Sequence, residues 1–148
     1  MKSIIFKRSK SIIMLGKRNI SIDILKENIE KTQNKFYEIF GVGIPISYNP
    51  HNSIIDNGFK NILDIMTVDK RSIVARLISF SENEIEIMPE KEEYIELLED
   101  LKEKDYELKL RAIGSKNKND NNIRIIAFDL VRYVNYNRWY KWQIQELI

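Results

Sequence analysis

The sequence predicts an α+β domain in which a mostly antiparallel sheet, built from β-hairpins, carries helices packed mainly on one face. Two observations lead to this expectation. Apolar residues recur at intervals of three and four in some segments, which indicates helices, and at intervals of two in others, which indicates strands. Residues 73–131 follow the order hairpin, helix, hairpin, which favours an antiparallel sheet. With 148 residues and no long linker, we expect a single domain over residues 1–148.

The N-terminal part of the chain is expected to form strand and then helix. Residues 3–7 and 10–15 predict two short strands, or one bent strand. The helix that follows begins after Ser21, a suitable N-cap, and ends before Gly41. Its apolar stripe is interrupted at residues 32–33. The stripe consists of Ile22, Leu25, Ile29, Phe36 and Phe40.

A loop and a second helix are expected next. Residues 41–52 contain two glycines and two prolines, which predict irregular structure. Ser53 and Asp56 have the spacing of a capping box, so a helix is expected to begin there. We expect this helix to bury one face against the sheet. That face is formed by Ile55, Phe59, Ile62, Leu63 and Met66.

Strands dominate the C-terminal half of the predicted domain. Residues 73–80 have a period of two with apolar side chains on both faces, and residues 84–88 alternate acidic with apolar side chains, so together they predict a hairpin with one wetter strand. Pro89 suits the first turn of the acidic helix that follows. A second strand pair is expected at 106–112 and 123–131, and the latter strand is apolar on both faces, which favours a central position in the sheet. The acidic helix has an apolar stripe of Tyr94, Leu97, Leu98 and Leu101.

The composition excludes several classes of chemistry. The chain has no cysteine, so disulfides, thiolate metal sites and cysteine nucleophiles are impossible. It also lacks a P-loop, a dinucleotide-binding fingerprint and the nucleophile elbow of serine hydrolases. No apolar run is long enough to span a membrane and no secretory signal is evident. We therefore expect a cytoplasmic protein that has no membrane contact and no cofactor.

Charge is distributed unevenly along the chain, although the net charge is only +2. Residues 1–18 carry six basic side chains and no acidic one. Residues 82–107 carry 12 acids and three bases, whereas residues 108–148 carry eight bases and three acids. Such separation of charge can steer charged partners toward one side of a protein.

The basic ends favour nucleic acid as the partner. Lys and Arg can contact phosphates, and the aromatic rings of the C-terminal tail can stack on unpaired bases. The tail, residues 135–148, is expected to be a helix, and its rings could instead close the core. The tryptophans of this tail could also form a homodimer interface. The candidate nucleic-acid-binding residues are Lys7, Arg8, Lys10, Arg132, Tyr136, Arg138, Trp139, Lys141 and Trp142.

A protein partner is the main alternative. The acidic segment 82–107 could bind a basic protein, although such acids commonly serve as a solvated helix face. The abundance of Ile, Lys and Asn resembles A/T-rich coding sequence, which fits a small inhibitor or accessory protein of phage or mobile-element type. The candidate protein-binding residues are Glu92, Glu93, Glu96 and Glu99.

Candidate catalytic residues are few. The single histidine, His51, could act as a general base oriented by a nearby acid. Carboxylates could hold Mg²⁺, as in metal-dependent nucleases, and the possible sets are Asp56, Asp64 and Asp69, or Glu84 and Glu86 on a strand. Asp56 and Asp64 can lie on one side of the second helix. Because convergent polar residues are otherwise scarce, we expect a non-enzymatic binding or regulatory protein without a resident metal, and most simply one that contacts nucleic acid.

Overall fold

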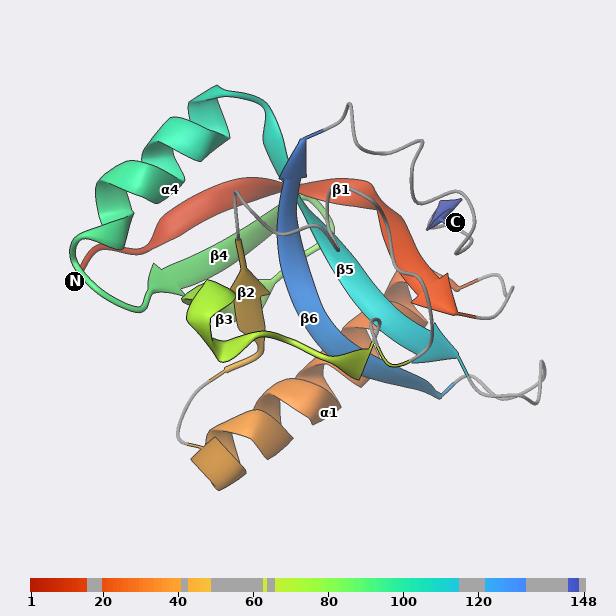
Figure 1. The fold of residues 1–148 in the computed structure, drawn as a ribbon. Helices are drawn as coiled ribbons and strands as arrows, with labels where there is room; N and C mark the ends of the chain where they lie inside the picture. The colour runs from red at the N-terminus through yellow and green to blue at the C-terminus, as the bar shows by residue number, and fades with distance from the viewer. Residues whose placement is uncertain are drawn as a thin grey trace.

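Within the part of the chain that the structure describes, the protein is a β-barrel of six strands, with a seventh strand outside the ring and two α-helices of ten or more residues (Figure 1). Its computed structural model describes residues 1–15, 20–40, 43–48, 63, 66–114, 122–132 and 144–146. Around the barrel the strands follow the order β1 (Ile4–Leu15), β5 (Tyr106–Gly114), β6 (Ile123–Arg132), β2 (Pro45–Ser47), β3 (Ile73–Phe80) and β4 (Glu84–Pro89). Pairing of β4 with β1 closes the ring. The short strand β7 (Ile144–Glu146) lies outside it, against β1.

Two of the six strand pairings in the barrel are parallel. β1 runs parallel to β5 and β2 runs parallel to β6, whereas the remaining neighbours are antiparallel. The expectation of a mostly antiparallel sheet with helices packed mainly on one face is wrong, because the strands close into a mixed barrel and the helices do not cover one face of a sheet. The hairpins β3–β4 and β5–β6 were predicted, but their strands join partners distant in the sequence and close into a barrel, which removes the exposed edges of an open sheet.

Strand β1 makes this closure possible because it is long and changes partners along its length. Its first part, Ile4 to Lys7, pairs antiparallel with β4. Its second part pairs parallel with β5 from Arg8 onward, and the register shifts between Arg8 and Ile12. Such an irregularity lets a strand bend around a barrel. Of the two interpretations of this segment, the single bent strand is confirmed.

The hydrophobic core fills the inside of the barrel. Alternate residues of β5 and β6, such as Leu108, Leu110 and Phe128, point inward and are almost fully buried. Each large apolar side chain buried in this way stabilises the fold by about 1.5–3 kcal/mol. The other strands contribute mainly isoleucine, leucine, phenylalanine and alanine. These residues include Ile4, Phe6, Ile46, Ala75, Leu77, Ile85 and Ile87.

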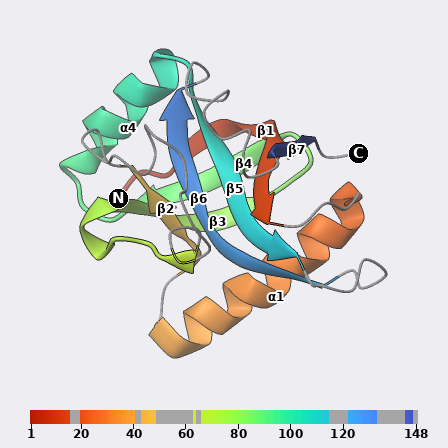
Figure 2. The same cartoon turned by 45° about the vertical axis from the view of Figure 1, so that its right-hand side comes forward.

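Helix α1 (Ile22–Phe40) matches its predicted bounds. Ser21 caps it: the Ser21 hydroxyl accepts a hydrogen bond from the Ile24 N–H at 3.3 Å. Leu25 and Ile29 are buried against the barrel, as the stripe predicted. The helix contacts β6 and β3, and Figures 1 and 2 place it on the opposite side of the barrel from the second helix, α4 (Tyr94–Glu103).

The gap in the stripe of α1 has a structural purpose. The Gln33 side chain donates from Nε2 to the Leu77 carbonyl at 2.6 Å and accepts from the Ile44 N–H at 2.9 Å. It thus joins α1 to the start of β2 and to β3. Gly43 allows this close approach, because a Cβ atom there would lie 2.3 Å from the Leu77 carbonyl oxygen. A polar residue and a glycine therefore close this seam of the barrel.

Three further expectations are corrected by the structure. Pro89 ends strand β4 and does not begin a helix, because α4 starts at Tyr94. Leu63 and Met66 were expected to be buried but are 70% and 39% exposed. The other residues of that predicted face lie outside the described part of the chain. The C-terminal tail was expected to be helical, but residues 144–146 form strand β7 and complete a pairing with β1.

Candidate functional site: a basic groove beside helix α1

The basic N-terminal residues lie against acidic residues of the 82–107 segment. Lys7 stands opposite Glu84 across the β1–β4 pair, and the Arg8 side chain donates to the Glu82 carbonyl. Lys2 forms an ion pair of 3.2 Å with Glu99. The positive charge of the N-terminal segment is thus partly neutralised by acids of the 82–107 segment where β1 lies beside β4 and α4.

The other predicted nucleic-acid contacts are described only in part. Lys10 lies in β1 and Arg132 ends β6, with the backbone alone described at both positions. Among the predicted tail residues, Tyr136, Arg138, Trp139, Lys141 and Trp142 lie outside the described residues, so these assignments stay predictions. The same holds for the catalytic candidates His51, Asp56 and Asp64.

The predicted acidic face lies on and beside α4. Glu96 and Glu99 belong to the helix, and Glu92 and Glu93 precede it. A shallow hollow of about 620 Å³ along this helix is lined, among the described residues, by acids and one leucine. Among all the residues that the structure describes, no group of three or more acidic or histidine side chains could hold a metal ion.

Buried polar side chains of three neighbouring strands, β2, β6 and β5, contact one another in the barrel wall, apart from the hydrophobic core. Asp129 of β6 accepts hydrogen bonds from the Ser47 hydroxyl at 2.8 Å and from Arg111 Nη2 at 3.0 Å. Its second oxygen lies 3.0 Å from Arg111 Nε. All three side chains are almost fully buried. Because Arg111 donates to one carboxylate oxygen and forms an ion pair with the other, the arrangement is suited to fixing the barrel wall.

These buried polar side chains also position the chain that precedes β3. Arg111 Nη1 donates to the Thr67 carbonyl at 2.9 Å, which fixes the segment from Met66 to Val68 against β5. Beside Arg111 on the same strand, Lys109 is buried and lies 2.9 Å from the Glu107 carboxylate. The sequence shows these charged residues as the alternating polar positions of β5, but it gives no sign of their burial.

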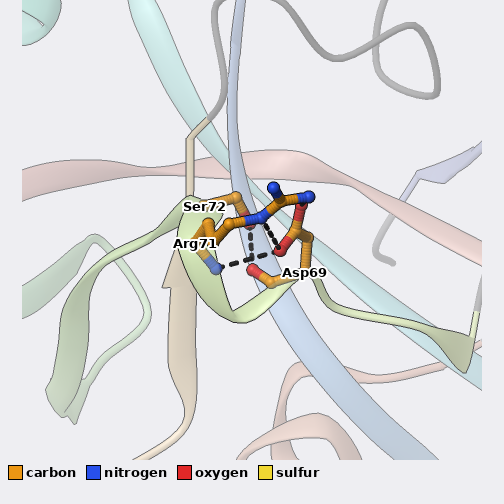
Figure 3. Close-up of polar contacts among 3 residues, drawn as sticks. All are labelled: Asp69, Arg71 and Ser72. Carbon is orange, nitrogen blue, oxygen red and sulfur yellow. Dashed lines mark hydrogen bonds and ion pairs between the residues drawn. The ribbon is translucent and has the colours of Figure 1, made fainter.

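A tight turn follows, in which Asp69 organises its neighbours (Figure 3). Its carboxylate accepts from the backbone N–H of Arg71 at 3.0 Å and from the Arg71 guanidinium at 3.3 Å. Its carbonyl accepts from the Ser72 hydroxyl at 2.6 Å. The backbone N–H of Arg71, and then the guanidinium, lower the pKa of Asp69, and Asp69 in turn raises the pKa of Arg71. Both groups therefore stay ionised at neutral pH, and Arg71 is held at the surface, where its side chain is 90% exposed.

Two adjoining hollows form what we call the basic groove: the first lies between α1, residues 66–68 and the start of β6, and the second between the end of α1, this turn, β3 and the start of α4. They have volumes of about 580 Å³ and 670 Å³, and both are lined by Phe36, Pro45 and Val68. The basic residues that line the two hollows are Lys35, Lys70, Arg71, Arg76, Lys91 and Arg124.

Positive charge exceeds negative charge in the basic groove. The one acid among the described lining residues is Glu90, which forms an ion pair with Arg76. Lys91 lies 5.8 Å from the ring centroid of Tyr94, and its ammonium is 3.8 Å from Glu93. Within the described part of the chain, Lys35, Lys70 and Arg124 have no carboxylate at ion-pair distance. These three cations are available to an anionic ligand.

Sequence reasoning missed this groove. Its six basic residues come from α1, the turn before β3, β3 itself, the approach to α4, and β6. They are scattered between positions 35 and 124, where they form no cluster in the sequence. Only the closure of the barrel and the docking of α1 bring them to one surface.

Comparisons of the chain with protein-family models, with curated proteins and with solved structures found no match. Neither helix of the described residues is long and apolar enough to cross a membrane. A functional assignment therefore rests on the residues and geometry of this chain alone.

Proposed function

We propose that this protein binds nucleic acid through the basic groove. The carrying observation is that six basic side chains line two adjoining hollows and that three of them, Lys35, Lys70 and Arg124, have no carboxylate at ion-pair distance among the described residues. The whole chain has a net charge of only +2, so this concentration of positive charge is local. A polyanion gains affinity at such a surface because it releases condensed counterions when lysine and arginine neutralise its phosphates.

The apolar walls of the groove favour a nucleic acid over a simple polyanion. Phe36 and Tyr94 are half-buried and line the two hollows, and Met66 is 39% exposed in the first one. Bases offer apolar faces to such walls, whereas polyphosphate and acidic peptides offer little matching surface. The predicted contacts at Arg132 and in the tail remain part of the proposal.

A salt titration tests this function directly. Binding of fluorescently labelled oligonucleotides, single-stranded and duplex, is measured by anisotropy over a series of NaCl concentrations. Three or four phosphate contacts predict that log K falls with log salt with a slope of about −2 to −3.5. Polyglutamate of similar total charge serves as the control ligand and is expected to bind more weakly. No detectable binding of either oligonucleotide, a slope near zero, or equal binding of polyglutamate would contradict the proposal.

A further inference from the structure

We infer that the basic groove selects single-stranded over double-stranded nucleic acid, because its apolar walls take up unpaired bases while its cations that are unpaired among the described residues hold the backbone. This inference rests on the proposed function and adds the kind of nucleic acid. It follows from the shape of the site and from the way in which apolar walls and these cations lie together in both hollows.

The shape of the site is concave. A protein that recognises the base edges of a duplex inserts a protruding helix or β-ribbon into a DNA groove about 12 Å wide. The basic groove offers the opposite geometry: its hollows lie between α1, the segment before β3 and the starts of β6 and α4. A duplex could touch only the rim of such a hollow with its phosphates. A single strand, whose bases can turn away from its backbone, can enter it.

Both halves of the groove combine apolar walls with basic residues. The first hollow is walled by Phe36, Met66, Val68 and the isoleucines at the start of β6, with Lys35 and Arg124 as its basic residues. The second contains four basic residues. Phosphates held by Lys70 and Arg124, one in each hollow, would leave the neighbouring bases beside Phe36, which borders both hollows. Base-on-ring stacking of this kind does not depend on sequence, since every base has an aromatic face.

Ligand variants test the inference on the wild-type protein. Three ligands of equal length are compared at one salt concentration: a single strand, the corresponding duplex, and a single strand of abasic sugar-phosphate units. We expect the base-containing single strand to bind about ten-fold or more tighter than the abasic strand, given the usual strength of base stacking. It should also bind more tightly than the duplex. Equal binding of the single strand and the abasic strand, or tighter binding of the duplex, would overturn the inference while leaving nucleic-acid binding intact.

Substitutions at Phe36 test whether its ring is the surface on which the bases stack. Phe36→Leu keeps an apolar side chain at the boundary of the two hollows but removes the ring, and Phe36→Ala removes more of it. Tyr37→Ala is the matched control, because Tyr37 is the next residue of α1, is 67% exposed and does not line the groove. Phe36→Leu should reduce the preference for bases over the abasic strand several-fold, and Tyr37→Ala should not. If both variants or neither reduce that preference, Phe36 does not stack on bases and the inference fails. Absence of binding by all three ligands would instead refute the proposed function itself.

Discussion

The basic groove and the acidic face of α4 are both charged surfaces, but they arise in different ways. The acids of α4 lie on one helix and face solvent because of helical periodicity alone. The cations of the groove come from five separate parts of the chain and meet only in the folded barrel. The acidic face should therefore tolerate changes to the barrel wall, whereas the groove should be sensitive to any loss of the buried contacts that shape it.

The largest effect is expected at Asp129, which supports the wall behind the groove. Asp129→Ala leaves the buried guanidinium of Arg111 without its carboxylate, and breaking a buried pair in this way costs about 3–5 kcal/mol. Urea denaturation measures the loss in free energy of unfolding. Asp129→Asn, which keeps the shape, serves if the alanine variant does not fold.

Asp100→Ala is the matched control for Asp129. Asp100 also pairs with a cation, Lys104, at 2.8 Å, but both side chains are half exposed. An exposed pair of this kind contributes only about 0–1 kcal/mol. Equal destabilisation by the Asp129 and Asp100 variants would show that the buried polar side chains do not hold the wall together.

A smaller loss is expected at the seam beside α1. Gly43→Ala places a Cβ atom 2.3 Å from the Leu77 carbonyl oxygen, so the backbone must shift, at a cost of about 1–3 kcal/mol. Gln33→Ala removes the partner of the Ile44 N–H and of the Leu77 carbonyl, and it should cost a similar amount, about 1–3 kcal/mol. Thermal unfolding followed by circular dichroism measures both. Asn34→Ala, at an exposed neighbouring position on α1, should have almost no effect, and a loss as large as that of Gln33→Ala would argue against the seam.

The local elements of this fold could be predicted from the sequence. Helix α1, the β3–β4 and β5–β6 hairpins and the body of α4 follow from hydrophobic periodicity and from the Ser21 cap, because neighbouring residues determine them. The interruption at Gln33 was visible too, as a gap in an apolar stripe. Its meaning was not, since the groups that Gln33 binds, at Ile44 and Leu77, lie in other parts of the chain.

The closed barrel could not be predicted for a related physical reason. The parallel pairs β1–β5 and β2–β6 join segments about 80–100 residues apart, and no local pattern encodes such a partner. Strand β2 is also only three residues long and begins with a proline. The basic groove could not be predicted for the same reason, because its residues are brought together by contacts between distant segments. Sequence reasoning placed the basic surface at the chain ends, whereas Lys7 and Arg8 lie beside acidic residues and the groove is assembled from the middle of the chain.

The most direct test reverses the charge of two residues in the groove and, as a control, of two residues outside it. Lys70→Glu with Arg124→Glu reverses two exposed groove cations that have no acidic partner among the described residues. Lys31→Glu with Lys102→Glu makes the same change of net charge at exposed positions that do not line the groove.

Affinity for a single-stranded oligonucleotide is measured for both double variants at several salt concentrations. We predict that the groove pair lowers affinity by about 100-fold and reduces the salt slope by about two, because two phosphate contacts are lost. The control pair should change affinity by only a few-fold, through the weaker long-range effect of net charge. Equal losses in the two double variants would contradict the claim that this groove is the nucleic-acid-binding site.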